Sequence, residues 1–202
     1  MNYPRYLYLC RHGQSQWNAQ GLLQGQSENS LSPLGQQQVQ ELAAKAKHWQ
    51  IQQIYHSTLG RAAQTAQVCA HALRLIAQPL IGAEERHFGE WQGQPIAELS
   101  QYQHFTQSRY QKVYLKPNPS GESTQTVQHR MHSAIRQIVS NTDQQPITNG
   151  NRNIMLISHG DAIDCLLTLW VAPVELKNCQ AVRLIQAGNT FVWDGLIASK
   201  VY

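Results

Sequence analysis

Two histidine–glycine pairs in this chain each follow a short apolar run. The run Tyr6–Cys10 leads into the Arg-His-Gly triplet Arg11–Gly13, and the run Ile154–Ile157 leads into the Ser-His-Gly triplet Ser158–Gly160. Short apolar runs are typical of buried strands, and glycine lets the backbone turn or approach a ligand closely. If the two strands are parallel neighbours, both imidazoles emerge at the edge of the sheet where α/β proteins bind ligands.

Two arginines are placed to share that edge. Arg11 directly precedes His12, and Arg61 falls in the first turn of a helix that the residues Ser57–Thr58 are predicted to cap. A cation in that turn opposes the helix dipole, whereas the free backbone N–H groups beside it favour an anion. Together these groups predict a pocket for a dianion. Phosphate fits best, because the arginine fork binds its oxygens in pairs.

An acid-rich segment, Glu84–Gly93, is the third feature of chemical interest. Its mixture of acids, bases, glycines and aromatic residues suits neither a helix face nor a strand face, so we expect a loop at the mouth of a site. Any of its carboxylates could act as a general acid or base. His129 and His132 could pair on a metal, but no third ligand accompanies them, so no metal site is predicted.

The composition sets limits on partners and on location. Of the 202 residues, 42% are hydrophobic and only 14% are charged, which allows a sizeable core and leaves many polar positions to glutamine. The net charge of +4 forms no basic stripe, so no nucleic-acid partner is predicted, although an anionic small molecule would suit it. The sequence predicts neither a signal peptide nor a membrane span, so we expect a cytoplasmic protein without a membrane partner. The four cysteines lie in apolar segments and are expected to be buried free thiols.

Strands and helices are predicted to alternate along most of the chain, which favours an α/β fold: a three-layer sandwich with a mostly parallel central sheet and helices on both faces. The predicted strands are 6–10, 53–56, 80–81, 154–157, 181–185 and 190–193, and the last two could form a hairpin. The predicted helices are 33–49, 59–73, 123–138 and 161–172. Other segments are expected to be a long loop (11–31), a helical excursion (94–115) and a surface loop (143–153).

Taken together, the motifs resemble those of the histidine phosphatase superfamily, in the branch that includes cofactor-dependent phosphoglycerate mutases. The resemblance runs in family order over nearly the whole chain, through Arg11–Asn18, Gln24–Gly25, Leu31–Gly35, Ser57–Ala66, Glu85–Gly93, Gly121–Ser123 and Ser158–Gly160. It implies a single domain over residues 1–202, with a short helical insertion at about 94–120.

The resemblance also implies a site. His12 would be the nucleophile, and Glu85 would protonate the leaving alcohol and then activate water. The catalytic residues are expected to be His12, Glu85 and His159, and the phosphate-binding residues to be Arg11, Asn18, Arg61 and Gly160. Choosing Glu85 over Glu84 or Glu90 rests on alignment with the family motif. No metal and no cofactor are expected, because the arginines supply fixed positive charge.

The region between the acid-rich segment and Ser120 bears on the reaction. It is short, and Arg109 is its only arginine, whereas the mutases are expected to carry paired arginines for a phosphoglycerate carboxylate. We therefore expect a phosphomonoester hydrolase, of the broad-specificity or α-ribazole-phosphate type, acting on a small phosphorylated metabolite as a monomer or homodimer. The alternatives are a cofactor-dependent phosphoglycerate mutase and a non-catalytic module that binds a phosphorylated ligand.

Overall fold

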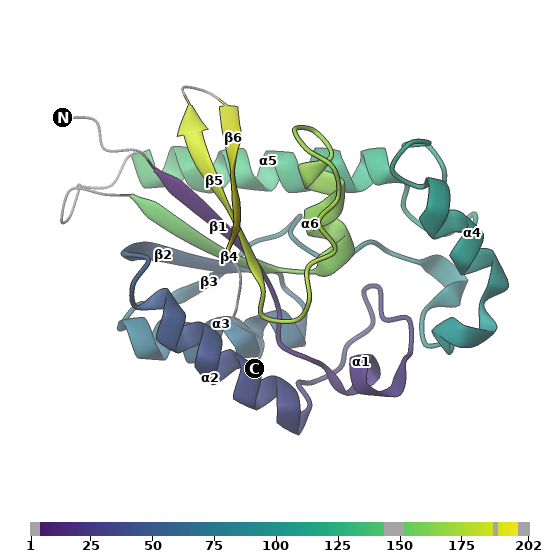
Figure 1. Ribbon diagram of the computed structural model, residues 1–202, viewed down its shortest axis with the longest axis horizontal. Coiled ribbons are helices and arrows are strands. Elements are labelled where there is room, and N and C mark those ends of the chain that lie inside the picture. The colour runs from purple at the N-terminus through teal and green to yellow at the C-terminus, as the bar shows by residue number, and fades with distance from the viewer. Residues whose placement is uncertain (1–4, 144–151, 188–189, 198–202) are drawn as a thin grey trace.

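A six-stranded sheet forms the centre of the computed structural model, which describes residues 5–143, 152–187 and 190–197 (Figure 1). The strand order is β3-β2-β4-β1-β5-β6, and β1 to β4 are mutually parallel while β5 and β6 add an antiparallel hairpin. The strands are β1 (Tyr6–Arg11), β2 (Ile51–His56), β3 (Ala77–Pro79), β4 (Asn153–Ser158), β5 (Ala181–Ala187) and β6 (Thr190–Ile197). The predicted α/β fold is confirmed, as is the predicted parallel pairing of the two strands that end in histidine.

Helices cover both faces of this sheet, with α5 and α6 on one side and α2 and α3 on the other (Figure 1). The helices are α1 (Gln16–Gln20), α2 (Pro33–Ala46), α3 (Gly60–Leu73), α4 (Ser100–Ser108), α5 (Thr124–Asp143) and α6 (Gly160–Leu167). Two short 3-10 helices, η1 (Gly89–Trp91) and η2 (Ile96–Glu98), precede α4. Among the described residues, no helix has the length and apolar character needed to cross a membrane.

Strand β1 is apolar up to Cys10 because helices cover both faces of the sheet. Leu7 and Leu9 pack in the core beneath α5 and α6, while Tyr8 and Cys10 pack in the core beneath α2 and α3. Successive side chains point to opposite faces of a strand, so a strand covered on both faces needs apolar residues at every position. All four cysteines are buried free thiols, as predicted.

Two segments differ from the prediction. The predicted loop 11–31 contains α1, because Ser15 and Asn18 form a capping box and Gly21 ends the helix in a left-handed conformation. The third strand is β3 rather than Leu80–Ile81. As an edge strand, β3 pairs only with β2 and needs few apolar side chains, whereas Leu80 packs in the core beneath α5.

Other boundaries moved by a few residues. Helix α2 begins as predicted, with the Ser32 side chain accepting a hydrogen bond from Gly35 N, but it ends at Ala46. The predicted helical excursion is interrupted, since η2 ends at Glu98, α4 ends at Ser108, and turns follow. The predicted loop 143–153 lies mostly outside the described residues.

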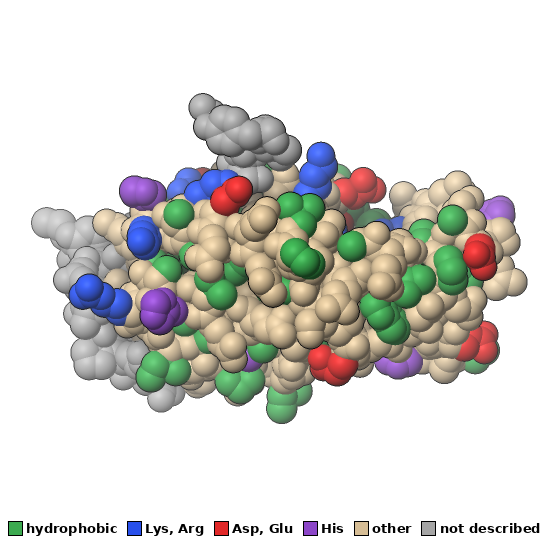
Figure 2. All heavy atoms as spheres, turned by 90° about the horizontal axis from the view of Figure 1, so that it is seen from below, with side chains coloured by type: hydrophobic (Ala, Val, Ile, Leu, Met, Phe, Trp, Pro, Cys, Tyr) green, Lys and Arg blue, Asp and Glu red, His purple; other side chains and the backbone are tan. Residues whose placement is uncertain are grey.

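Viewed from below, the surface shows scattered charges among uncharged polar groups and no basic stripe (Figure 2).

Candidate active site

The ends of β1 and β4 bring the two predicted histidines together. Arg11 lies opposite Ser158 in the parallel register, so the next residue of each chain segment, His12 and His159, leaves the sheet at the same edge. Their ring centroids are 5.0 Å apart with the rings inclined at 61°. Both side chains are buried. The edge faces the side of the molecule that carries α1 and α4 (Figure 1).

His12 is held as a neutral imidazole. Its Nδ1 lies 2.6 Å from the carbonyl oxygen of Gly13, and because a carbonyl only accepts, Nδ1 carries the proton. The Nε2 lone pair is therefore left for other groups. Burial lowers the pKa of His12 well below its ordinary value of 6.5, and the nearby guanidiniums of Arg61 and Arg11 lower it further. An unprotonated Nε2 is the form of imidazole that can act as a nucleophile.

Arg61 lies in the first turn of α3 and is fixed by three hydrogen bonds. Its Nε donates to Nε2 of His12 at 3.2 Å, Nη1 donates to the Ser27 carbonyl at 2.9 Å, and Nη2 donates to the Gly25 carbonyl at 2.7 Å. Gly25 has a φ of +53°, and a Cβ there would collide with the side chain of Gln92. Burial lowers the pKa of Arg61 to about 10, which leaves it cationic at neutral pH.

Arg11 and Gly160 meet at the start of α6. Nη1 of Arg11 donates a hydrogen bond of 2.7 Å to the Leu176 carbonyl. A Cβ on Gly160 would lie 3.3 Å from Arg11 Nη1, closer than most side-chain contacts, so glycine leaves room for the guanidinium. The buried Nε of Arg11 has no hydrogen-bond partner among the described residues and remains available to an anion.

His159 is oriented by Ser57. The Ser57 Oγ lies 2.8 Å from Nε2 of His159 and also accepts a hydrogen bond from Leu59 N. The serine hydroxyl can therefore donate to Nε2, which places the imidazole proton on Nδ1. Burial, then Arg61 and His12, lower the pKa of His159 well below 6.5. Ser57 was predicted as a helix cap, but the N-cap residue of α3 is Leu59, which makes no side-chain cap.

Of the three candidate acids Glu84, Glu85 and Glu90, Glu85 is the one whose side chain lines the cavity. Its oxygens accept hydrogen bonds from the backbone N–H groups of Arg86, Ala162 and Asp161, at 2.9, 2.8 and 3.3 Å. Burial raises the pKa of Glu85, and the negative charge of Asp161 adds to that increase. A raised pKa keeps a carboxyl group protonated closer to neutral pH, as a general acid requires.

The other two carboxylates point elsewhere. Glu84 accepts hydrogen bonds from the Thr58 hydroxyl and from Gly82 N. Glu90 is exposed on η1 and does not line the cavity. Of these three carboxylates, that of Glu85 is the one in the cavity lining.

Arg130, which no sequence motif indicates, supports the acid-rich segment from outside the cavity lining. From α5 it donates to the carbonyls of Gly82, Glu84 and Glu85 at 2.9, 2.6 and 2.8 Å. It also pairs with Glu122 at 2.8 Å. Arg130 thus ties the acid-rich segment to α5.

These side chains converge on a cavity of about 370 Å³, a size suited to a small molecule. His159 is the one predicted site residue that its walls do not include, and its ring lies 5.0 Å from that of His12. The predicted site residues in the walls are Arg11, His12, Asn18, Arg61, Glu85 and Gly160. The Oδ1 of Asn18 accepts from Ser15 N, which leaves the Asn18 amide nitrogen for a ligand.

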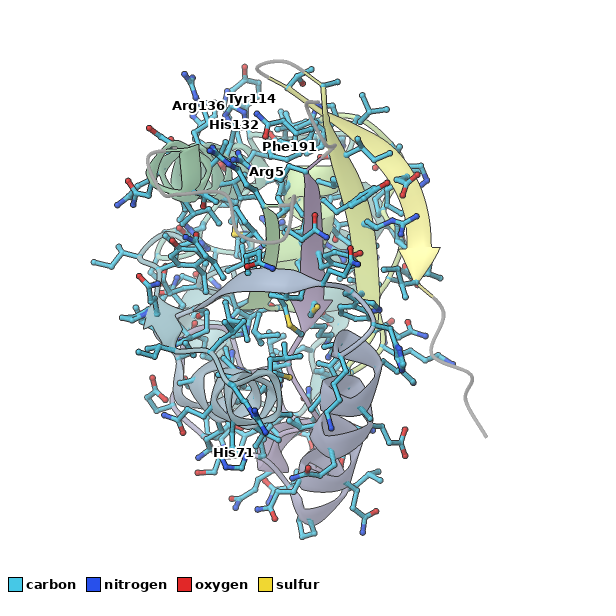
Figure 3. The ribbon with its side chains drawn as sticks, turned by 90° about the vertical axis from the view of Figure 1, so that its left-hand side faces the viewer. Arg5, His71, Tyr114, His132, Arg136 and Phe191 are labelled. Atoms are coloured by element: carbon cyan, nitrogen blue, oxygen red, sulfur yellow. The ribbon has the colours of Figure 1, made fainter. Side chains whose placement is uncertain are left out.

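No group of three or more histidine, cysteine, aspartate or glutamate side chains suited to a metal occurs in the part of the chain that the structure describes. His132, labelled on α5 in Figure 3, lies beside Trp170 with ring centroids 6.4 Å apart. His129 is exposed on the same helix. Around His12 the cavity presents a neutral imidazole, the guanidiniums of Arg11 and Arg61, and a carboxyl group of raised pKa. That set of groups suits in-line transfer of a phosphoryl group.

Comparison with known proteins agrees with this geometry. The chain is 33% identical to a protein named "Probable phosphoglycerate mutase GpmB" from Escherichia fergusonii, over 95% of this chain and 89% of that protein. A mycobacterial glucosyl-3-phosphoglycerate phosphatase superposes with a TM-score of 0.80 at 25% identity, covering 96% of this chain and 98% of the other.

A phosphoglycerate mutase from Bacillus anthracis shares the fold, with a TM-score of 0.83 at 18% identity over 96% of this chain and 92% of that one. The family model for the histidine phosphatase superfamily, branch 1, matches residues 7–192. The chain therefore belongs to the histidine phosphatase superfamily.

Proposed function

We propose that this protein hydrolyses small phosphomonoesters through a phosphohistidine intermediate on His12. The observation that carries the proposal is the state of His12: a buried, neutral imidazole whose Nε2 faces the cavity between Arg61 and Arg11. Fixed cations beside the nucleophile stabilise the charge that develops on the transferred phosphoryl group.

The first half-reaction forms the phosphoenzyme. The Nε2 lone pair of His12 attacks phosphorus while the bond from phosphorus to the ester oxygen breaks. The Glu85 carboxyl group gives its proton to that oxygen, so the product leaves as a neutral alcohol. Arg11 and Arg61 bind the non-bridging oxygens, while His159 lies beside the His12 ring and not in the cavity wall. The hydrogen bond from Nδ1 of His12 to the Gly13 carbonyl stabilises the ring as it becomes positive.

The second half-reaction restores the enzyme. A water molecule attacks phosphorus from the side that the alcohol has left, and the Glu85 carboxylate accepts its proton. The bond between phosphorus and Nε2 then breaks, which releases inorganic phosphate and neutral His12. Because Glu85 regains its proton in this step, one group serves as acid and then as base.

A second candidate function is phosphoglycerate mutase activity, because related proteins carry the name "Probable phosphoglycerate mutase GpmB". It would use the same phosphohistidine, but a substrate oxygen rather than water would receive the phosphoryl group. A third possibility is binding of a phosphorylated ligand without turnover. It would require that His12 and Glu85 do not react with the bound ligand.

One set of assays separates the three. Purified protein is incubated with p-nitrophenyl phosphate in the presence of EDTA, beside the variants His12→Ala and His129→Ala, the latter a control on the exposed face of α5. Turnover that is lost in His12→Ala and kept in His129→Ala supports the phosphatase. A coupled assay with 3-phosphoglycerate and 2,3-bisphosphoglycerate tests the mutase. No turnover over a panel of phosphomonoesters would contradict the proposal and favour a binding role.

A further inference from the structure

The Glu85 carboxyl group lies against the first turn of α6. Its Oε1 accepts a hydrogen bond from Ala162 N at 2.8 Å, and its Oε2 accepts one from Asp161 N at 3.3 Å. Backbone N–H groups at the start of a helix stabilise a negative charge. Arg11 and Arg61 line the same cavity and also favour the charged form of Glu85. These four neighbours favour a carboxylate, whereas the proposed mechanism needs Glu85 to hold a proton until the alcohol leaves.

The side chain of Asp161 provides a negative charge at the same turn. Its Oδ1 accepts hydrogen bonds from Arg109 Nε and from the Tyr110 hydroxyl, both at 2.7 Å, and its Oδ2 accepts one from Arg86 Nε. Burial opposes ionisation of this carboxyl group, but Arg86 and then Arg109 hold the pKa of Asp161 below its ordinary value of 3.8. The pKa of Glu85 is raised above 4.5, so Asp161 is already ionised where Glu85 titrates.

The ion pair with Arg86 fixes the segment that carries Glu85. Arg86 directly follows Glu85 in the chain, and its side chain is fully buried. Besides the bond to Asp161, its Nη1 donates to the Glu122 carbonyl at 3.0 Å and its Nη2 donates to the Thr124 hydroxyl at 2.9 Å. The Asp161 side chain therefore joins the residue next to the acid to the helical turn whose N–H groups bind the acid.

The ion-pair cluster of Asp161, Arg86 and Arg109 has a net positive charge, because two guanidiniums share one carboxylate. The effect of Asp161 on Glu85 is therefore a difference. Without the Asp161 charge, the two guanidiniums would favour the charged form of Glu85 with no carboxylate between them. Burial raises the pKa of Glu85 most, and the negative charge of Asp161 raises it further.

Other ionisable groups near Glu85 do not compete with this effect. Tyr102 of α4 lines the cavity, and burial raises its pKa to about 12, while burial also raises the pKa of the Cys165 thiol on α6. Both side chains are therefore neutral near pH 7, as is His12. Arg130 of α5 donates to the backbone carbonyl of Glu85. In the described part of the chain, three further charged residues line the cavity without a hydrogen bond to Glu85: Asp164, Glu175 and Lys177.

We infer that Asp161 is a positioning residue for the acid: its side chain anchors Arg86 and so holds Glu85 against α6, and its negative charge there favours the protonated carboxyl group. This inference rests on the proposed function, in which Glu85 protonates the leaving alcohol. Asp161 acts through Glu85 and not on the substrate. Removing its charge should therefore make Glu85 lose its proton at lower pH.

The test measures the titration of Glu85 directly. Glutamate side chains are labelled with ¹³C at the carboxyl carbon, and Glu85→Gln identifies the Glu85 resonance by NMR. In Asp161→Asn the titration midpoint of Glu85 should fall by at least about half a pH unit. The alkaline loss of kcat/KM for butyl phosphate should move to lower pH with it. Asp194→Asn removes the same charge from an ion pair with Arg183 on the hairpin of β5 and β6, and should leave both unchanged.

A second variant separates the charge of the cluster from its structure. Arg109→Gln also breaks an ion pair of Asp161, but it removes a positive charge, so the Glu85 midpoint should move to higher pH. A disturbed structure would instead move the midpoint in the same direction in both variants. An unchanged midpoint in folded Asp161→Asn would overturn the inference, as would an unchanged or lower midpoint in Arg109→Gln. If Asp161→Asn does not fold, the Arg109→Gln result decides.

The titration needs no turnover, so it separates the inference from the proposed function. Hydrolysis of phosphomonoesters with unshifted Glu85 midpoints would overturn the inference and leave the phosphatase proposal standing. The expected shifts in a protein that hydrolyses no phosphomonoester would overturn the proposed function and leave the coupling between Asp161 and Glu85 standing.

Discussion

Nε of Arg61 donates a hydrogen bond of 3.2 Å to Nε2 of His12, the atom that attacks phosphorus in the proposed mechanism. The bond keeps the imidazole neutral, because protonating Nε2 would place two positive charges against each other in a buried site. When a phosphate enters, its oxygens can accept the hydrogen bond that Arg61 Nε donates to His12. The Nε2 lone pair is then free to attack phosphorus. In the proposed mechanism, Arg61 therefore links substrate binding to activation of His12.

Replacing Arg61 by lysine tests the geometry of that contact. A lysine ammonium keeps the charge. It cannot, however, donate at once to the carbonyls of Gly25 and Ser27 and to Nε2 of His12, as the guanidinium does. We expect kcat for p-nitrophenyl phosphate to fall by about a hundredfold. Steady-state kinetics measure this, with circular dichroism to confirm folding. A folded variant with unchanged kcat would show that charge alone suffices.

The pH dependence of kcat/KM tests the state of His12. Because its pKa lies well below 6.5, the nucleophile stays neutral as the pH falls through 6.5, and activity should show no loss there from imidazole protonation. Arg61→Gln removes a neighbouring charge that lowers this pKa, so the loss of activity on acidification should move to higher pH. Both proteins are assayed with the same substrate, so titration of the substrate phosphate affects both pH profiles equally. If kcat/KM falls at the same pH in both proteins on acidification, Arg61 does not lower the pKa of His12.

Glu85→Gln removes the proposed acid. Because burial raises the pKa of Glu85, its protonated form persists to higher pH and is lost as the pH rises through that pKa. For an alkyl phosphate, kcat/KM should therefore fall on the alkaline side, and Glu85→Gln should lack this fall and be slower by about a hundredfold or more. The loss should be smaller for p-nitrophenyl phosphate, whose leaving group needs little protonation. Glu90→Gln, in the same segment but exposed, is the matched control and should retain activity.

Asp164 provides a prediction about stability. Burial raises its pKa from 3.8 to about 6, so between those pH values the folded state binds more protons than the unfolded state. The free energy of unfolding should therefore decrease as the pH rises through this window, by about 1–3 kcal/mol. In Asp164→Asn the amide oxygen can still accept from Val174 N and Glu175 N, and this decrease should be absent. Urea unfolding at pH 4 and pH 7 measures the difference, and parallel pH dependences for the two proteins would contradict the assignment.

The pairing of His12 with His159 could be predicted from the sequence because each histidine follows an apolar strand, and parallel strands end at one edge. Arg61 could be placed because a cation in a first helical turn has no structural benefit there. The roles of Arg130 and Asp161 could not be predicted, since Arg130 binds backbone carbonyls and Asp161 meets its arginines only in the folded chain. Local sequence patterns carry no signal for such contacts.

The missed elements have a similar cause. Strand β3 lies at the edge of the sheet and pairs only through its backbone with β2, so it lacks the apolar pattern that identified the inner strands. Helix α1 is five residues long and is defined by the reciprocal hydrogen bonds of Ser15 and Asn18 rather than by an apolar face. Short or peripheral elements depend on such local contacts more than on hydrophobic periodicity.

The central claim is that His12 carries the phosphoryl group, and trapping the intermediate tests it most directly. The protein is mixed rapidly with p-nitrophenyl phosphate, quenched in alkali, which preserves phosphohistidine, and analysed by mass spectrometry of the intact chain and its peptides. We expect one added phosphoryl group on the peptide that contains His12. The label should be absent from His12→Ala and should last longer in Glu85→Gln, in which water is not activated. Turnover without a labelled His12, or a label on another residue, would contradict the account.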